Sequence, residues 1–170
     1  MSLPHLTWPA IIVGIVALER LGELVVARNH TLALLREGAY EIGRGHYPLI
    51  VALHAAWLIA VYAAAPNEPP IWPLIAVFAL LQAARYWVLA TLGRYWTTRI
   101  IVVPGAPLVT GGPYRFMRHP NYAVVVAEIA VLPLAFREPL VAALFSALNL
   151  AVLWWRVRTE TRSLNERGTF

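Results

Sequence analysis

The chain has 170 residues, of which 59% are hydrophobic and 14% charged, and its mean hydropathy is +0.61. Soluble domains carry charged side chains at nearly twice that frequency, so the composition excludes an ordinary soluble domain and indicates a protein of the bilayer. The net charge of +5 comes from 14 arginines that form no nucleic-acid-binding stripe, and the absence of cysteine excludes disulfides and thiolate chemistry.

Five apolar segments approach the length that a helix needs to cross a bilayer. In chain order they are 8–27, 47–65, 71–92, 120–136 and 140–155. The last two are separated only by Arg137-Glu138-Pro139, which predicts a tight antiparallel hairpin. The sequence therefore predicts an all-α integral membrane protein with about five transmembrane helices, a single domain over 1–170 and a cytoplasmic helix end at the carboxyl terminus.

The arginines are distributed unequally between the connections. Eleven lie in 28–46, 93–119 and 156–170, whereas the other connections hold only Arg137. By the positive-inside rule, the arginine-rich connections face the cytoplasm. The sequence therefore predicts a multi-pass protein of the inner (cytoplasmic) membrane, with its amino terminus outside and its carboxyl terminus and active site in the cytoplasm.

A polar stretch, GPYRFMRHPNY at 112–122, stands at the mouth of the fourth apolar segment. Irregular polar sequence at a membrane edge is exposed, caps a helix or lines a cavity. Pro120 suits the first turn of a helix and places His119 before the helix starts, so the amides of that turn could hold an anion. Arg156 and Glu160 are four residues apart and share a helix face if the last helix continues past the membrane. Both groups are predicted on the cytoplasmic side, where they can face each other.

The stretches LGRYWTTRIIVV, LVTGGPYRFMRHPNY and RVRTETRSL, between Leu92 and Leu164, resemble the isoprenylcysteine carboxyl methyltransferase family of integral membrane enzymes, which use S-adenosylmethionine. The combination of GPYR, RHPNY and a following RxxxE is more specific than RHP alone. The resemblance implies a helical membrane enzyme whose cofactor is enclosed by the last loops and the carboxyl-terminal helix, at about 92–170. It also implies that the substrate enters from the lipid.

Taken position by position, the resemblance implies a set of functional residues. Arg156 would hold the oxygen nucleophile of the substrate. The implied cofactor contacts are Arg99, Pro107, Leu108, Val109, Tyr114, His119, Pro120, Asn121, Tyr122 and Glu160.

The amino-terminal half looks like a bacterial subgroup of that family encoded beside type III polyketide synthases. The similarity lies in ERLGELVVARNHTLALLREGAYEIGRGHYPLIVALH at 19–54 and VVVAEIAVLPLAF at 124–136. It implies O-methylation of a long-chain alkylpyrone or alkylresorcinol, a lipophilic acceptor that enters from the bilayer, and a functional link to a type III polyketide synthase.

Methyl transfer from a sulfonium requires an aligned oxygen nucleophile and exclusion of water. A carboxylate needs no base, whereas a phenol, with a reference pKa of about 10, needs deprotonation or stabilisation of its oxyanion. Arg156 or Arg118 could supply that stabilisation, because arginine stays charged. Glu128, two turns into the fourth segment, is a candidate proton acceptor, and pairing with Arg85 is the structural alternative.

Other interpretations stay open at this point. The acceptor could be an isoprenylcysteine-like carboxylate, and the chain could be a small non-enzymatic membrane protein. A metal-dependent oxidoreductase is disfavoured and no metal is predicted, because no histidine pair has ligand spacing. For Glu19, Arg20 and Glu23, in the first apolar segment, pairing inside the membrane is favoured over catalysis.

Overall fold

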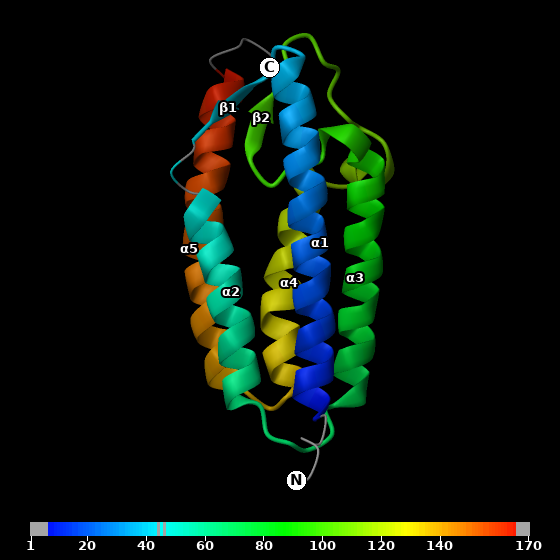
Figure 1. Cartoon of the computed structure of the whole chain (residues 1–170), viewed down its shortest axis with the longest axis vertical. Helices are drawn as coiled ribbons and strands as arrows, with labels where there is room; N and C mark the ends of the chain where they lie inside the picture. The colour runs from blue at the N-terminus through cyan, green and yellow to red at the C-terminus, as the bar shows by residue number, and fades with distance from the viewer. Residues whose placement is uncertain (1–6, 44, 46, 166–170) are drawn as a thin grey trace.

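The computed structural model describes residues 7–43, 45 and 47–165, with side chains up to residue 158. Its helices run side by side along the long axis of the molecule (Figure 1). They are α1 (Trp8–Arg36), α2 (Tyr47–Ala64), α3 (Trp72–Leu92), α4 (Pro120–Ala135) and α5 (Pro139–Asn165). The predicted all-α membrane protein is therefore confirmed, and the predicted limits of the three central helices agree with the structure to within one residue.

Within the described residues, three helices are long and apolar enough to cross a membrane: Tyr47–Ala64, Trp72–Tyr95 and Pro139–Arg158. Helix α4 is apolar but has only 16 residues. Helix α1 has 29 residues, and its middle carries Glu19, Arg20 and Glu23. Large apolar side chains such as Leu18 and Leu80 point outward at about 70% exposure, as expected for helices surrounded by lipid.

Two features differ from the sequence-based expectation. Helix α1 continues beyond the predicted 8–27 as far as Arg36, because Thr31 and Leu34 continue its buried face past Ala27. A two-stranded antiparallel ribbon pairs β1 (Tyr40–Ile42) with β2 (Ile100–Val102), in a register that sets Glu41 opposite Ile101. This ribbon joins the connection after α1 to the connection after α3 at one end of the bundle (Figure 1).

The apolar core lies where the five helices meet, and α3 contributes Phe78 to it. Trp57, Ile129 and Leu132 are almost fully buried there, and the Trp57 indole Nε1 donates to the Ile129 carbonyl at 3.2 Å. The predicted hairpin between α4 and α5 is present: the Glu138 amide donates to the Pro133 carbonyl at 2.9 Å. Helix α4 is therefore fixed between α5 on one side and α3 on the other.

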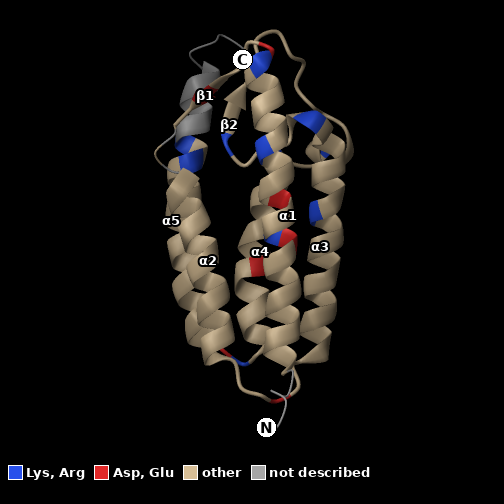
Figure 2. Ribbon diagram, in the orientation of Figure 1, with Lys and Arg blue, Asp and Glu red and all other residues tan. Residues whose placement is uncertain are grey.

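Most charged side chains gather in two regions, apart from a small group at the end opposite the ribbon that includes Arg137 and Glu68 (Figure 2). Most arginines lie at the end of the bundle that carries the ribbon, while a smaller group of both signs lies at mid-height where α1, α3 and α4 approach one another. The first region contains the predicted cofactor residues, and the second contains the acids and arginines predicted inside the membrane.

Candidate functional site

The mouth of α4 is built from residues that the sequence predicted. The helix begins at Pro120, and His119 precedes it with φ −130° and ψ 61°, outside the helical range. The His119 ring stacks on the Tyr122 ring, with centroids 5.1 Å apart and planes inclined by 16°. The Asn121 side-chain oxygen Oδ1 is buried and has no hydrogen-bond partner among the described residues. The mouth thus combines an aromatic pair with an unsatisfied acceptor.

Arg156 connects α5 to this mouth. Its side chain is almost buried, its Nε donates to the Tyr122 hydroxyl at 2.9 Å, and its Nη1 donates to the Thr98 carbonyl at 2.8 Å. The end of α5 was predicted to face the mouth of α4, and the contact between Arg156 and Tyr122 confirms this for Arg156. Helix α5 continues through position 160, but the Glu160 side chain lies outside the described residues.

The segment between β2 and α4 covers this end of the bundle. A short 3-10 helix, η3 (Gly112–Arg115), carries the half-buried Tyr114 and is held against α3 at Gly112. Gly112 has φ +54°, and a Cβ there would lie 2.5 Å from the Thr91 Oγ1, so only glycine fits without a shift. The remaining predicted positions, Pro107, Leu108, Val109 and Arg118, lie on this same segment, all exposed except the half-buried Val109.

Arg99 contacts the amino-terminal half of the chain. Its Nη1 lies 2.9 and 3.0 Å from the two carboxylate oxygens of Glu41 in β1, and its guanidinium lies 4.4 Å from the ring centroid of Tyr47 in α2. Sequence reasoning missed both partners. The GAYEIG stretch was the available signal for Glu41, whereas nothing in the sequence indicated that Tyr47 would meet Arg99.

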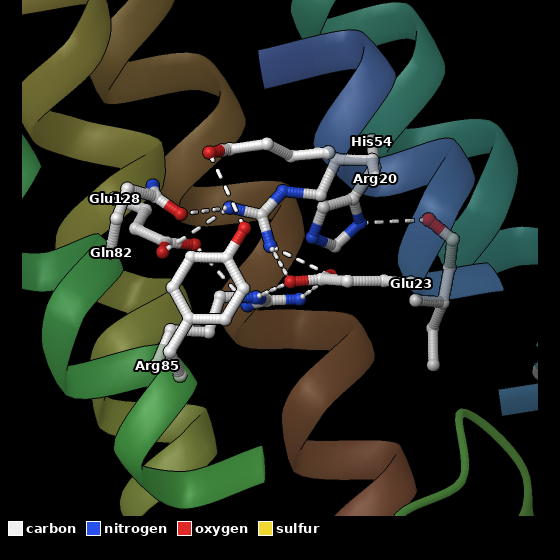
Figure 3. Close-up of polar contacts among 9 residues, drawn as sticks. Arg20, Glu23, His54, Gln82, Arg85 and Glu128 are labelled. Carbon is white, nitrogen blue, oxygen red and sulfur yellow. Dashed lines mark hydrogen bonds and ion pairs between the residues drawn. The ribbon is translucent and has the colours of Figure 1, made fainter. Parts of the chain in front are cut away.

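A second polar group lies at mid-height between α1, α3 and α4 (Figure 3). Arg20 donates to Glu23 at 2.8 and 3.0 Å, to Gln82 at 2.8 Å and to Glu128 at 3.3 Å. Arg85 donates to Glu23 at 2.6 Å through two nitrogens and to Glu128 at 3.3 Å. Two cations therefore face two anions, which confirms the predicted pairing for Arg20 and Glu23, whereas Glu19 accepts a hydrogen bond from the Tyr86 hydroxyl instead. We call Arg20, Glu23, Gln82, Arg85 and Glu128 the buried charge cluster.

Glu128 belongs to the buried charge cluster and not to the mouth. Its side chain is only 5% exposed, and both of its carboxylate oxygens accept a hydrogen bond from an arginine. It lies six residues beyond Tyr122, about 9 Å along the helix axis. The geometry therefore gives Glu128 a role in holding α4 against α1 and α3. Sequence reasoning had identified its pairing with Arg85 and missed its second cation, Arg20.

Comparison with known proteins places this site in a family. The family model described as isoprenylcysteine carboxyl methyltransferase (ICMT) family matches residues 74–166, which include the mouth of α4 and Arg156. The uncharacterized protein YpbQ of Bacillus subtilis is 39% identical over 161 residues, which cover 92% of this chain and 96% of that protein. An uncharacterized protein of Haemophilus influenzae is 24% identical over 154 residues, covering 86% and 88% of the two chains. No solved structure gives a significant match.

Proposed function

The chain belongs to the isoprenylcysteine carboxyl methyltransferase family and is a membrane methyltransferase, and from this premise we propose that it methylates an oxygen atom of a lipophilic acceptor with S-adenosylmethionine as the methyl donor. When bound, this cofactor supplies a methyl group that is electrophilic because it is attached to a sulfonium. The proposal is carried by the convergence of His119, Asn121, Tyr122 and Arg156 at the mouth of α4.

The residues at the mouth fit the chemistry of this cofactor. The buried Asn121 Oδ1 has no protein partner among the described residues and suits an N–H donor, such as the adenine amino group or the α-ammonium group. The positive end of the α4 dipole at Pro120 suits a carboxylate, although the Tyr122 and Ala123 amides already donate to the His119 carbonyl at 3.1 and 3.4 Å. The other positions of the covering segment, with Tyr114 and Glu160, would complete the enclosure. Arg99 would support this enclosure indirectly, because its guanidinium is already bound by the Glu41 carboxylate.

Arg156 is the group we assign to the oxygen nucleophile. Its guanidinium is held at two atoms by Tyr122 and Thr98, so its orientation is fixed before any ligand arrives. A fixed cation beside a developing or existing oxyanion stabilises it without reorganisation during the reaction. Arg118 lies next to His119 in the chain and adds positive charge at the same edge. Both arginines serve a carboxylate or a phenolate equally well.

The acceptor we propose is a long-chain alkylpyrone or alkylresorcinol, which implies a functional link to a type III polyketide synthase. The resemblance of 19–54 to the polyketide-linked subgroup supports this choice. An isoprenylcysteine-like carboxylate is the second candidate, favoured by the family to which the chain belongs. We place the site at the cytoplasmic face of the inner membrane, since the arginines cluster at the same end of the bundle as the mouth (Figure 2).

Calorimetric titration of S-adenosylmethionine and S-adenosylhomocysteine into detergent-purified protein tests the cofactor site. We expect saturable binding that Asn121→Ala weakens about tenfold, because one hydrogen bond to a buried acceptor is lost. Asn149→Ala is the matched control, since Asn149 is also a buried amide with an unpaired side-chain atom but lies seven residues before Arg156 in α5. Folded protein that binds neither compound, with or without an acceptor present, would refute the proposal.

The acceptor is tested by transfer of an isotopically labelled methyl group in the same detergent. We expect labelled product from pentadecylresorcinol and none from N-acetyl-farnesylcysteine. The reverse pattern would establish the carboxylate acceptor and reject the polyketide one. Protein that binds S-adenosylhomocysteine and methylates neither would leave the cofactor site standing and reject both acceptors.

A further inference from the structure

A cavity of about 500 Å³ lies between α1 and α3, away from the mouth of α4. We call it the α1–α3 groove. Helix α1 lines it with a stripe that includes Glu19, Gly22, Val26 and His30, and α3 contributes Tyr86 and Leu89. The spacings of three and four residues put the α1 stripe on one helix face. Gly22, Val26 and Tyr86 are exposed, so the groove opens outward to the surface that lipid surrounds.

Two hydrogen bonds between the helices mark the ends of the groove. At the deeper end, the Tyr86 hydroxyl donates to the Glu19 carboxylate at 3.4 Å. At the end nearer the mouth, His30 Nδ1 lies 2.9 Å from the carbonyl oxygen of Trp96. The eleven residue steps from Glu19 to His30 span about 16.5 Å along the helix. Glu23 also lines the groove between these ends, but its carboxylate is already bonded to Arg20 and Arg85. Gly22, Val26 and Leu89 supply apolar surface beside it, so the groove suits an extended apolar chain, and its volume is that of a site for a small ligand.

His30 supplies a defined hydrogen-bond acceptor at the end nearer the mouth. The Trp96 carbonyl can only accept, so His30 Nδ1 carries the proton, and in the neutral ring Nε2 keeps its lone pair. His30 also lines the groove. A hydroxyl group that entered there could donate to Nε2.

The same end of the groove adjoins the proposed transfer site. Trp96 is bound by His30 of α1, and two residues later Thr98 is bound by Arg156 of α5. The short segment 96–98 is therefore held from the groove side and from the mouth side. A headgroup beside Trp96 would be separated from the Arg156 guanidinium by this segment alone.

We propose that the α1–α3 groove binds the acceptor, taking an amphiphile with a long hydrocarbon tail and a ring hydroxyl. The tail lies along Gly22, Val26 and Leu89, one ring hydroxyl donates to His30, and a second ring oxygen is the nucleophile assigned to Arg156. The inference rests on the proposed function and adds the location of the acceptor to it.

Gly22→Leu is the variant that tests the groove. A Cβ added at Gly22 meets no atom within 4 Å, so a leucine there fills the groove without displacing the protein. Gly14→Leu is the matched control, because Gly14 is on the same helix, has the same open space around it and does not line the groove. Glycine is the weaker helix former, so neither substitution is expected to prevent folding.

The probe is a pentadecylresorcinol that carries a diazirine in its tail, photolysed with the purified protein in nanodiscs and mapped by mass spectrometry. We expect adducts on α1 near Val26 and on α3 near Leu89 that unlabelled pentadecylresorcinol competes away. Gly22→Leu should lower this labelling about tenfold, since the added side chain occupies the volume of several methylene groups, while Gly14→Leu leaves it unchanged.

Competed adducts elsewhere, no competed adducts at all, or equal labelling of the Gly22→Leu variant would each overturn the inference. The affinity for S-adenosylhomocysteine is measured on the same samples and should be equal in all three proteins. If that binding is absent while the groove is labelled, the proposed function fails and the groove stands as a lipid site. If the binding is present and the groove is not labelled, the location of the acceptor fails and the proposed function stands.

Discussion

Replacing Arg85 with methionine should destabilise the protein severely. The guanidinium is 7% exposed and donates to Glu23 at 2.6 Å from two nitrogens and to Glu128 at 3.3 Å. Without it, two buried carboxylates share the single cation Arg20. Removing one partner from a buried ion pair costs about 3–5 kcal/mol, which corresponds to roughly two to four orders of magnitude in the unfolding equilibrium constant.

The assay is equilibrium unfolding of purified protein in mixed micelles of increasing dodecyl sulfate content, followed by circular dichroism. Arg94→Met is the control, because it makes the same substitution two residues past the end of α3. Arg94 pairs with Glu37, but the two side chains are 54% and 52% exposed. An exposed pair contributes at most about 1 kcal/mol, so this variant should unfold close to the wild type.

A double variant distinguishes charge imbalance from lost packing. Arg85→Met combined with Glu23→Gln removes one cation and one anion, leaving Arg20 opposite Glu128 at 3.3 Å. We expect the double variant to be more stable than the sum of the single effects by about 1–3 kcal/mol. Additive effects, or an Arg85→Met variant within about 1 kcal/mol of wild type, would refute the view that balanced charge holds α1, α3 and α4 together.

Two further outcomes follow from the same geometry. Glu128→Gln should lower stability in this unfolding assay while the dependence of kcat on pH stays as in the wild type, because the carboxylate is bonded to Arg20 and Arg85; a changed pH profile would instead make Glu128 the proton acceptor. Gly112→Ala should destabilise by about 1–3 kcal/mol, since its Cβ would lie 2.5 Å from the Thr91 Oγ1 and its φ is +54°. Adding Thr91→Ala should recover part of that loss in thermal unfolding, and no recovery would contradict the steric explanation.

The amino-acid sequence predicted those structural features that depend on residues close together in the chain. The limits of α2, α3 and α4 followed from apolar runs bounded by proline and polar residues, and Pro120 fixed the start of α4 as expected. The pairing of Arg85 with Glu128 was identified because an unpaired ion is costly in a membrane, which restricts the possible partners to other intramembrane ions. The few charged residues inside the apolar segments therefore indicate which helices lie next to each other.

The features that the sequence did not reveal depend on contacts between distant polar loops. The ribbon of Tyr40–Ile42 with Ile100–Val102 has only three residues in each strand, too few for a periodic signal. The partners of Arg99 were also not predicted, because many acidic and aromatic residues in the connections could have contacted it. The α1–α3 groove was missed because a cavity is set by how far two helices stand apart, which apolar periodicity does not encode.

The segment 96–99 explains how the two halves of the chain act on one site. Three elements bind it: His30 of α1 at Trp96, Arg156 of α5 at Thr98, and Glu41 of β1 at Arg99. Helix α1 and strand β1 lie outside the stretch 74–166 that matches the family model, whereas α5 lies wholly inside it. The family-defined part therefore carries the proposed cofactor mouth, and the amino-terminal part supplies one wall of the groove. Substitutions in α1 alter that wall without altering the mouth of α4. We therefore expect the choice of acceptor to depend on α1 more than on any residue that contacts the methyl donor.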